Sequence, residues 1–200
     1  QIAHGADWIK LYPAGAYSFS STGKDVYEVT YPLPVLKAAI DEAHRLSKKT
    51  GCHAYGGEGL QNAIVAGCDT IEHGFGLNQE QVNAMVAKGL FYDPTLMRYT
   101  EPYMDDNDAK STGGKYRMIP IFERAVQMAS ATKGLKILVG SGADGSTFPH
   151  GTQALEFVVL VKHGGMTPAR VLQAGTLTNA EAMGWQDQIG SIEKGKFADM

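Results

Sequence analysis

The chain contains 200 residues, 44% of them hydrophobic and 20% charged, with a formal net charge of −3 at pH 7. These values predict a soluble globular protein of one domain with a substantial core. They argue against a nucleic-acid partner, because there is no basic excess to neutralise phosphates, and no apolar stretch reaches the roughly 20 residues that cross a membrane.

The first residues read QIAHGADWIK and lack the charged-then-apolar layout of a signal peptide. This favours a cytoplasmic location, although a chain whose true N-terminus is absent would carry no trace of a leader. The two cysteines, Cys52 and Cys68, lie in or beside apolar runs. We interpret both as small core residues rather than as a disulfide framework.

The first predicted strand reads WIKLY, residues 8–12. Because alternate strand residues point the same way, Trp8, Lys10 and Tyr12 share one face, and the two aliphatic residues between them share the other. The next segment, PAGAYSFSSTGKDVYEVTYP, is rich in glycine, serine and tyrosine. It predicts a long loop above the strand rather than a linker between domains.

Strands and helices alternate through the rest of the chain. Further strands are predicted over residues 50–55, 69–73, 90–96 and 136–140. Helices are predicted over residues 33–48, 59–67, 78–89 and about 120–133, then in TQALEFVVLVKHGG and from Thr167 onward. Residues 100–116 predict a mobile loop. This order is typical of βα units around a parallel sheet, but five strands are too few to close an eight-stranded barrel.

Four apolar runs each end on a polar residue that a metal ion could use. The runs WIKLY, GCHAYG, TIEHG and ILVGSGADG supply Lys10, His53, His73 and Asp144. Functional groups of parallel α/β folds collect where the strands end, so these four residues predict the rim of one site. Strand alternation places His53 with Tyr55, and His73 with Ile71, on the inward face.

Imidazole and carboxylate ligands suit a divalent metal such as zinc, whose catalytic sites commonly leave one position open for water. The metal lowers the pKa of that water to about 7, and a carboxylate such as Asp144 can take the proton as the water attacks a carbonyl. This is the chemistry of amide or ester hydrolysis. A lysine ammonium has no lone pair, so Lys10 is a ligand only when neutral or carbamylated by CO₂, and otherwise a salt-bridge residue.

Longer motifs carry a family resemblance. In chain order they are GADWIKLY, GCHAYGGEGLQNAIVAGCDTIEHG, GSGADGSTFPHGTQALE and TPARVLQAGTLTNAEAMGWQDQIGSIEKGKFADM. Together they resemble the amidohydrolase superfamily, and within it the branch of Xaa-Pro dipeptidase-like and imidazolonepropionase-related metal hydrolases. The resemblance covers nearly the whole chain and implies an α/β fold, the (β/α)8 TIM-barrel amidohydrolase fold, of which this chain covers strands 4 to 8.

The resemblance also implies a domain division and a ligand set. Residues 1–184 are expected to form the C-terminal portion of the barrel, and residues 185–200 the start of the return to a small β-sandwich domain. Lys10 resembles the lysine that is carboxylated to bridge two metals, His53 and His73 resemble two further ligands, and Asp144 resembles the aspartate that binds metal and acts as general base. The implied cofactor is one or two divalent ions, foremost zinc, with a CO₂-derived carbamate on Lys10.

The sequence departs from the family pattern at two places. Relatives usually have Gly-Thr-Asp or Gly-Ser-Asp at the last strand, whereas this chain reads GSGAD over residues 140–144. The His-x-His pair of the family's first strand is absent from the sequence. The chain therefore resembles a piece that begins just before strand four, and we expect a missing N-terminal segment or a homo-oligomer to cover the open edge of its sheet.

Three other polar residues are candidates for substrate binding. Tyr12 and Tyr55 would lie at the barrel mouth, where a tyrosine can equally be structural, and His150 follows the last predicted strand. Glu72 precedes a ligand histidine and could support it or form a plain ion pair.

The leading hypothesis is a metal-dependent hydrolase that cleaves the C–N bond of a small substrate such as a dipeptide or an N-acyl amino acid. One alternative is a mononuclear cyclic-amide hydrolase, similar to imidazolonepropionase. Another is an inactive fragment, because the His-x-His ligands are lacking. A third, a phosphate-binding barrel, could use GSGADG as an anion cradle but leaves the two histidines and Lys10 without a role.

Overall fold

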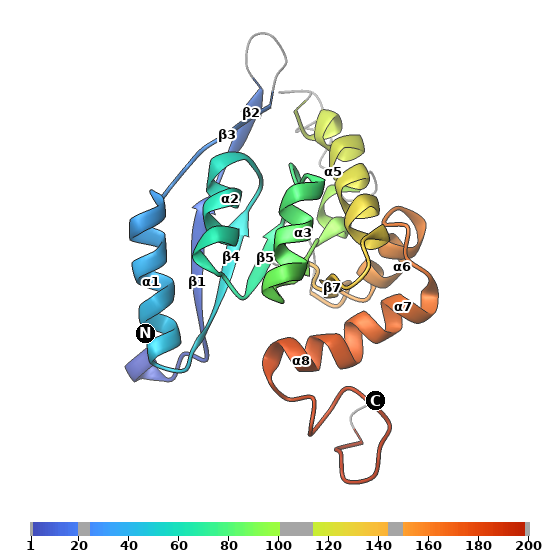
Figure 1. Ribbon diagram of the computed structural model, residues 1–200. Helices are drawn as coiled ribbons and strands as arrows, with labels where there is room; N and C mark the ends of the chain where they lie inside the picture. Colours follow the sequence, from blue (N-terminus) through green and yellow to red (C-terminus); the bar gives the residue numbers. More distant parts are fainter. Residues whose placement is uncertain (1, 20–24, 101–113, 144–149, 199–200) are drawn as a thin grey trace.

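The computed structural model describes residues 2–19, 25–100, 114–143 and 150–198 (Figure 1). Its centre is a sheet of five parallel strands that lie side by side in chain order. These strands are β1 (Trp8–Ala14), β4 (Lys49–Ala54), β5 (Thr70–His73), β6 (Phe91–Asp93) and β7 (Lys136–Ile137). The sequential order of parallel strands is that of successive βα units, as the alternation of motifs predicts.

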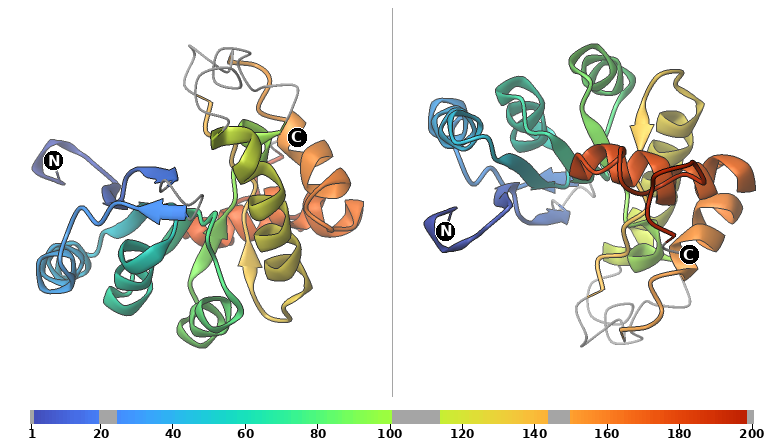
Figure 2. Two further views of the ribbon diagram at one scale, coloured as in Figure 1. Left: turned by 90° about the horizontal axis from the view of Figure 1, so that it is seen from above. Right: turned by 90° about the horizontal axis from the view of Figure 1, so that it is seen from below.

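Helices connect the strands and cover one face of the sheet. They are α1 (Leu33–Arg45), α2 (Gly57–Ala66), α3 (Gln79–Lys88) and α5 (Gly114–Ala131). Viewed along the strands, these helices form an arc outside a curved row of strands (Figure 2). The inner, concave face of the sheet is therefore the face that can hold a site.

Local sequence explains where the helices start and stop. α1 begins after Pro32, with a second proline in its first turn. α3 opens with a capping box in which Asn78 accepts from the Gln81 backbone N–H and the Gln81 side chain accepts from the Asn78 N–H. It ends at Gly89, which adopts the left-handed conformation with φ 69°.

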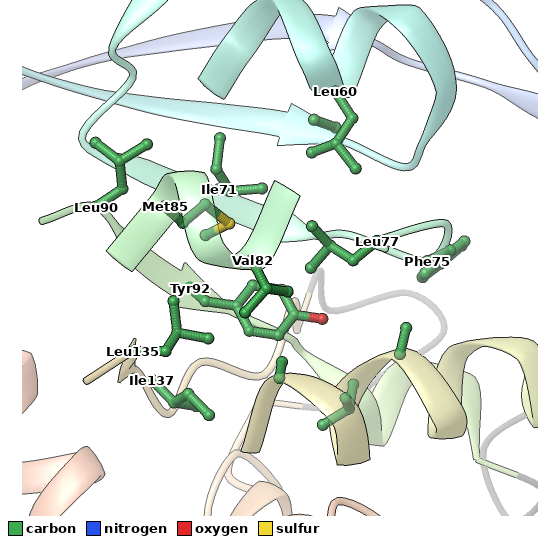
Figure 3. Packing of buried hydrophobic residues seen from close by; sticks show 14 of the residues in the cluster. Leu60, Ile71, Phe75, Leu77, Val82, Met85, Leu90, Tyr92, Leu135 and Ile137 are labelled. Carbon is green, nitrogen blue, oxygen red and sulfur yellow. The ribbon is translucent and has the colours of Figure 1, made fainter. Parts of the chain in front are cut away.

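The main core lies between the sheet and its outer helices. Ile71 and Tyr92, which are neighbours in the sheet, pack there against Leu60 of α2 and Met85 of α3, and all four are fully buried (Figure 3). α2 approaches the end of β1 so closely that a Cβ on Gly59 would overlap the Pro13 carbonyl oxygen. Glycine at this position lets the helix dock against the strand that carries Lys10.

The C-terminal helices follow the last strand. They are α6 (Leu155–Lys162), α7 (Pro168–Gln173), a π-helical turn (Ala174–Thr178) and α8 (Asn179–Met183). α8 lies beneath the N-terminal ends of the strands (Figure 2), where the Lys49 ammonium donates to the Ala182 carbonyl at 2.5 Å. At the start of α8, the Asn179 side chain also bonds both backbone groups of Val139, just after β7. Helix α8 thus closes the N-terminal end of the sheet, which leaves the opposite end for the site.

Two sequence interpretations need correction. The long loop after the first strand contains an antiparallel hairpin, β2 (Tyr17–Phe19) with β3 (Asp25–Tyr27). Cys52 and Cys68 are both fully buried, as expected, but they form a disulfide with a Cα–Cα distance of 6.2 Å. Cys52 lies in β4 and Cys68 in the short segment between α2 and β5, so their proximity depends on how β5 pairs with β4 rather than on local sequence.

Several of the features predicted from the sequence are not tested by the structure. The predicted mobile loop at 100–116 falls almost wholly outside the described residues, as does Asp144. Residues 185–198 run through turns and bends, and the domain boundary after residue 184 stays a prediction. Within the described ranges no helix is both long and apolar enough to cross a membrane.

Candidate functional site

A cavity of about 420 Å³ opens at the C-terminal ends of the strands. Its walls come from β1, β4, β5 and β6 and from the segments that follow β6 and β7. The lining residues are Lys10, Tyr12, His53, Tyr55, Glu72, His73, Asp93, Thr95, Arg98, Tyr99, Gly142 and Ala143. Three of the four predicted ligands, Lys10, His53 and His73, therefore share one cavity.

The two histidines are in direct contact. His53 Nδ1 lies 2.9 Å from His73 Nε2, within hydrogen-bond distance, and the rings meet edge to face with centroids 4.5 Å apart. On its other side His73 Nδ1 lies 2.6 Å from the Thr95 hydroxyl oxygen. Both nitrogens of His73 are thus engaged, which restricts the orientation of its ring.

Both imidazoles are neutral at physiological pH. Burial, reinforced by the nearby Lys10 ammonium, lowers the pKa of His53 to about 4. Burial also lowers the pKa of His73 well below its usual value, with further contributions from His53 and Lys10. His53 Nε2 is buried and has no hydrogen-bond partner among the described residues. A neutral imidazole with an available nitrogen is the form that binds metal ions.

His73 reaches the cavity in a way that strand alternation does not predict. The sheet register pairs His53 with Glu72 and Cys52 with Ile71, so Glu72 faces inward and Ile71 packs outward. The inward placement expected for Ile71 is therefore wrong. His73 turns inward because its φ is +69°, in the left-handed region, where the strand ends.

Two hydrogen bonds to the backbone hold this unusual conformation at the end of β5. The buried Tyr92 hydroxyl donates to the His73 carbonyl at 2.8 Å, and the N–H of Gly74 bonds the Ala54 carbonyl at 3.1 Å. Histidine tolerates the left-handed region better than β-branched residues do. The break in alternation brings two neighbouring residues, Glu72 and His73, into the same cavity.

Lys10 is paired with a carboxylate in this structure. Its ammonium forms an ion pair with Glu72 and lies 5.3 Å from the centroid of the Tyr12 ring. Burial lowers the pKa of Lys10 to about 8, and the charge of Asp93 opposes the shift. The amine is consequently neutral more often than an ordinary lysine, and a neutral amine is what reaction with CO₂ requires.

Asp93 is a cavity residue that the sequence analysis did not select. It ends β6, beside Glu72 in the sheet, and its Oδ1 has no hydrogen-bond partner among the described residues. Burial raises its pKa to about 6, although the Lys10 ammonium acts in the opposite direction. The signal was present in LFYDPTL, where Pro94 directly follows Asp93 and favours an end of the strand at that carboxylate, although the sequence pattern predicts a strand that runs on to residue 96.

We predict that Asp93→Asn stabilises the protein in a pH-dependent way. The folded carboxyl keeps its proton up to about pH 6, whereas the unfolded one releases it near its ordinary pKa of 3.8, so burial of the charge costs stability that grows as pH rises. Between pH 4 and pH 6 the advantage of the variant should increase by about 1 kcal/mol, after a discount for the water that reaches the cavity.

Urea titrations of both proteins from pH 4 to pH 7 measure this difference. Asp41→Asn, on the exposed face of α1, controls for the removal of one negative charge. A difference between Asp93→Asn and wild type that stays constant over this range would contradict the prediction.

Aromatic side chains form much of the remaining wall. Tyr12 stacks on His53 with ring centroids 4.7 Å apart, and Tyr55 meets the same imidazole edge-on at 4.4 Å. The Tyr55 and Tyr99 hydroxyls lie 3.2 Å apart. Arg98 Nη1 donates to the Gly142 carbonyl at 2.8 Å. Tyr12 and Tyr55 thus line the cavity, whereas His150 is exposed and lies outside its lining.

A model of the amidohydrolase family matches residues 1–200. The chain belongs to the amidohydrolase family. Ochratoxinase of Aspergillus niger is 27% identical over 204 residues, which cover all of this chain and 41% of that protein. Its crystal structure aligns with a TM-score of 0.84 and 26% identity over 99% of this chain and 44% of that chain.

Two other solved structures are similar to this chain. A Xaa-Pro dipeptidase with methionine bound in its active site is 29% identical, with a TM-score of 0.84 over 99% of this chain and 48% of that chain. A prolidase in complex with N-methylphosphonate-L-proline is 26% identical, with a TM-score of 0.82. The alignment covers 99% of this chain and 48% of that chain. The chain spans less than half the length of these relatives, and its five-stranded sheet matches part of their TIM barrel. The fold expected from the sequence is confirmed.

Proposed function

We propose that this amidohydrolase chain carries part of the active site of a metal-dependent hydrolase. Its expected substrate is a small molecule with an amide or peptide C–N bond, such as a dipeptide or an N-acyl amino acid. The observation that carries the proposal is the contact between two neutral imidazoles, His53 and His73, inside a cavity that also holds Lys10.

The donor set fits a divalent ion. His53 Nε2 is a buried nitrogen without a partner among the described residues, and His73 lies beside it. Within the described ranges no three His, Cys, Asp or Glu side chains are placed so that they could together hold a metal ion, so the two imidazoles would need further ligands. Lys10, as a carbamate, and Asp144 are the residues that we propose for this role. A bound divalent cation would supply Lewis acidity, which activates water and polarises a carbonyl.

The other cavity residues support binding of an acyl or peptidyl substrate. The rings of Tyr12 and Tyr55, which contact His53 face-on and edge-on, supply apolar wall to the cavity, and the Arg98 guanidinium belongs to the group type that binds carboxylates in bidentate fashion. A dipeptide or an N-acyl amino acid presents both features, an amide bond and a terminal carboxylate. The similar dipeptidase and prolidase structures agree with a substrate of this class.

One observation favours a second candidate, a hydrolase with a single metal ion. The Lys10 ammonium is held by the Glu72 carboxylate, and an ammonium cannot bind a cation. If this ion pair persists, Lys10 stays charged and one metal is held chiefly by the two imidazoles. The cyclic-amide hydrolase alternative belongs to this case.

The test is a metal count combined with activity on the complete protein. Plasma mass spectrometry should find one or two divalent ions per chain, and a panel of dipeptides and N-acyl amino acids should be hydrolysed. A chelator should abolish hydrolysis, and zinc should restore it. Labelled bicarbonate and carbon NMR should detect a carbamate only if two ions bind. Hydrolysis that is indifferent to the chelator, or a protein without metal, would sink the proposal.

A further inference from the structure

Glu156 is a fully buried carboxylate on α6 that the proposed chemistry does not use. Its Oε1 accepts the backbone N–H of Leu96 at 2.7 Å, and its Oε2 accepts that of Met97 at 2.5 Å. These two residues open η2 (Leu96–Tyr99), a single 3₁₀ turn that directly follows β6. One carboxylate therefore accepts hydrogen bonds from two successive backbone N–H groups of a turn about 60 residues away in the chain.

The turn held by Glu156 contributes three residues to the cavity. Thr95, Arg98 and Tyr99 all line it. Thr95 places its hydroxyl 2.6 Å from His73 Nδ1. Arg98 bonds the carbonyl of Gly142, in the segment after β7. Tyr99 meets the hydroxyl of Tyr55.

Thr95 needs support of this kind. Its backbone is left-handed, with φ 49° and ψ 42°, a conformation that is costly for a β-branched residue and persists only where neighbouring contacts impose it. The two N–H groups bonded by Glu156 belong to the residues immediately after Thr95. Without these bonds the chain could relax at Thr95, and its hydroxyl would leave His73.

Packing alone does not account for a carboxyl group at this position. Burial raises the pKa of Glu156, while the N–H groups of Met97 and Leu96, which favour the carboxylate, act against the rise. An apolar side chain would fill the same space without the cost of burying a polar group. The two short bonds to η2 are the compensating interaction that the structure provides.

We propose that Glu156 is a positioning residue that holds the η2 turn and thereby sets the ring orientation and tautomer of His73. Its effect on catalysis rests on the proposed hydrolase function, whereas its effect on the His73 ring does not. Glu156 touches neither the cavity nor the imidazoles, so it acts through Thr95.

The experiment compares Glu156→Gln with Leu160→Ala in the complete protein. Leu160 lies one turn further along α6 and is also fully buried, so its truncation weakens the packing of the same helix without removing an acceptor. Thr95→Val, which lacks the hydroxyl, provides the reference for a His73 ring that has lost its partner. Long-range proton–nitrogen NMR reports the tautomer of His73 in each protein.

We expect Glu156→Gln to shift the His73 ring signals in the direction of Thr95→Val, because an amide offers one acceptor oxygen where the carboxylate offers two. Leu160→Ala should leave them unchanged at a comparable loss of stability. If Glu156→Gln does not fold, Glu156→Asp, which keeps the carboxylate but shortens its reach, replaces it. Unchanged His73 signals in the Glu156 variant, or equal shifts in Leu160→Ala, would overturn the proposal.

Activity provides a separate readout. Loss of the group that orients a metal-binding histidine typically costs about 10–100-fold in activity or metal affinity, so kcat should fall by this amount in Glu156→Gln, with KM less affected. If the wild-type protein hydrolyses nothing in the substrate panel, the hydrolase proposal fails, and the NMR comparison still decides the role of Glu156.

Discussion

Replacement of either cavity histidine by asparagine should reduce kcat/KM for amide hydrolysis on the order of a thousandfold. His53 and His73 present the two neutral imidazoles that we propose as metal ligands. Loss of metal-assisted catalysis removes several kcal/mol of transition-state stabilisation, and each 1.4 kcal/mol is about tenfold in rate. Metal content should fall together with activity.

Asparagine is chosen because His73 has a left-handed backbone, which asparagine also tolerates. The variant therefore removes the imidazole with little added backbone strain. His163→Asn is the matched control, since His163 pairs with Glu123 at 2.8 Å on the outer surface between α5 and α6 and does not line the cavity. Full activity in His53→Asn or His73→Asn, with a correctly folded protein, would refute the assignment of the metal site.

Loss of the disulfide between Cys52 and Cys68 should lower the free energy of unfolding by about 3 kcal/mol. The bridge closes a loop of sequence separation 16, and a loop of about this length is expected to contribute roughly that amount by restricting the unfolded chain. The double variant Cys52→Ala with Cys68→Ala should show the loss in a denaturant titration without reductant. Wild-type protein unfolded with reductant should match it.

The double variant is also its own control, because reductant should not change its unfolding curve further. Thiol alkylation of the denatured, unreduced wild-type protein, followed by mass spectrometry, should find no free cysteine. Two alkylated cysteines would instead show that both residues are packed as free thiols, as the sequence alone suggests. The fold could tolerate that state, since both side chains are buried in the core.

Some residues of the cavity could be predicted from the alternation of side chains along single strands. Lys10, His53 and Tyr55 follow strand alternation, and the structure finds all three on the cavity wall. Asp93 follows the same rule and could have been selected from the end of its strand. Glu72 precedes His73 in sequence, but its inward direction follows from the register that pairs it with His53.

Other features depend on contacts between distant parts of the chain. The cavity position of His73 requires a left-handed backbone that Tyr92 helps to hold from the next strand. The role inferred for Glu156 requires α6 to dock against η2, about 60 residues earlier. His150, by contrast, follows the last strand in sequence but lies exposed, outside the cavity.

The order of strands and helices, the fold class and the family resemblance could all be predicted from the amino-acid sequence, because periodicity, capping residues and strand-end motifs are local signals. The Cys52–Cys68 bridge, the inward turn of His73 and the burial of Glu156 beneath a turn of the site instead depend on tertiary contacts. Each of these depends on which strand lies beside which and on backbone conformations that neighbouring elements impose, and such information is absent from any single segment of the chain.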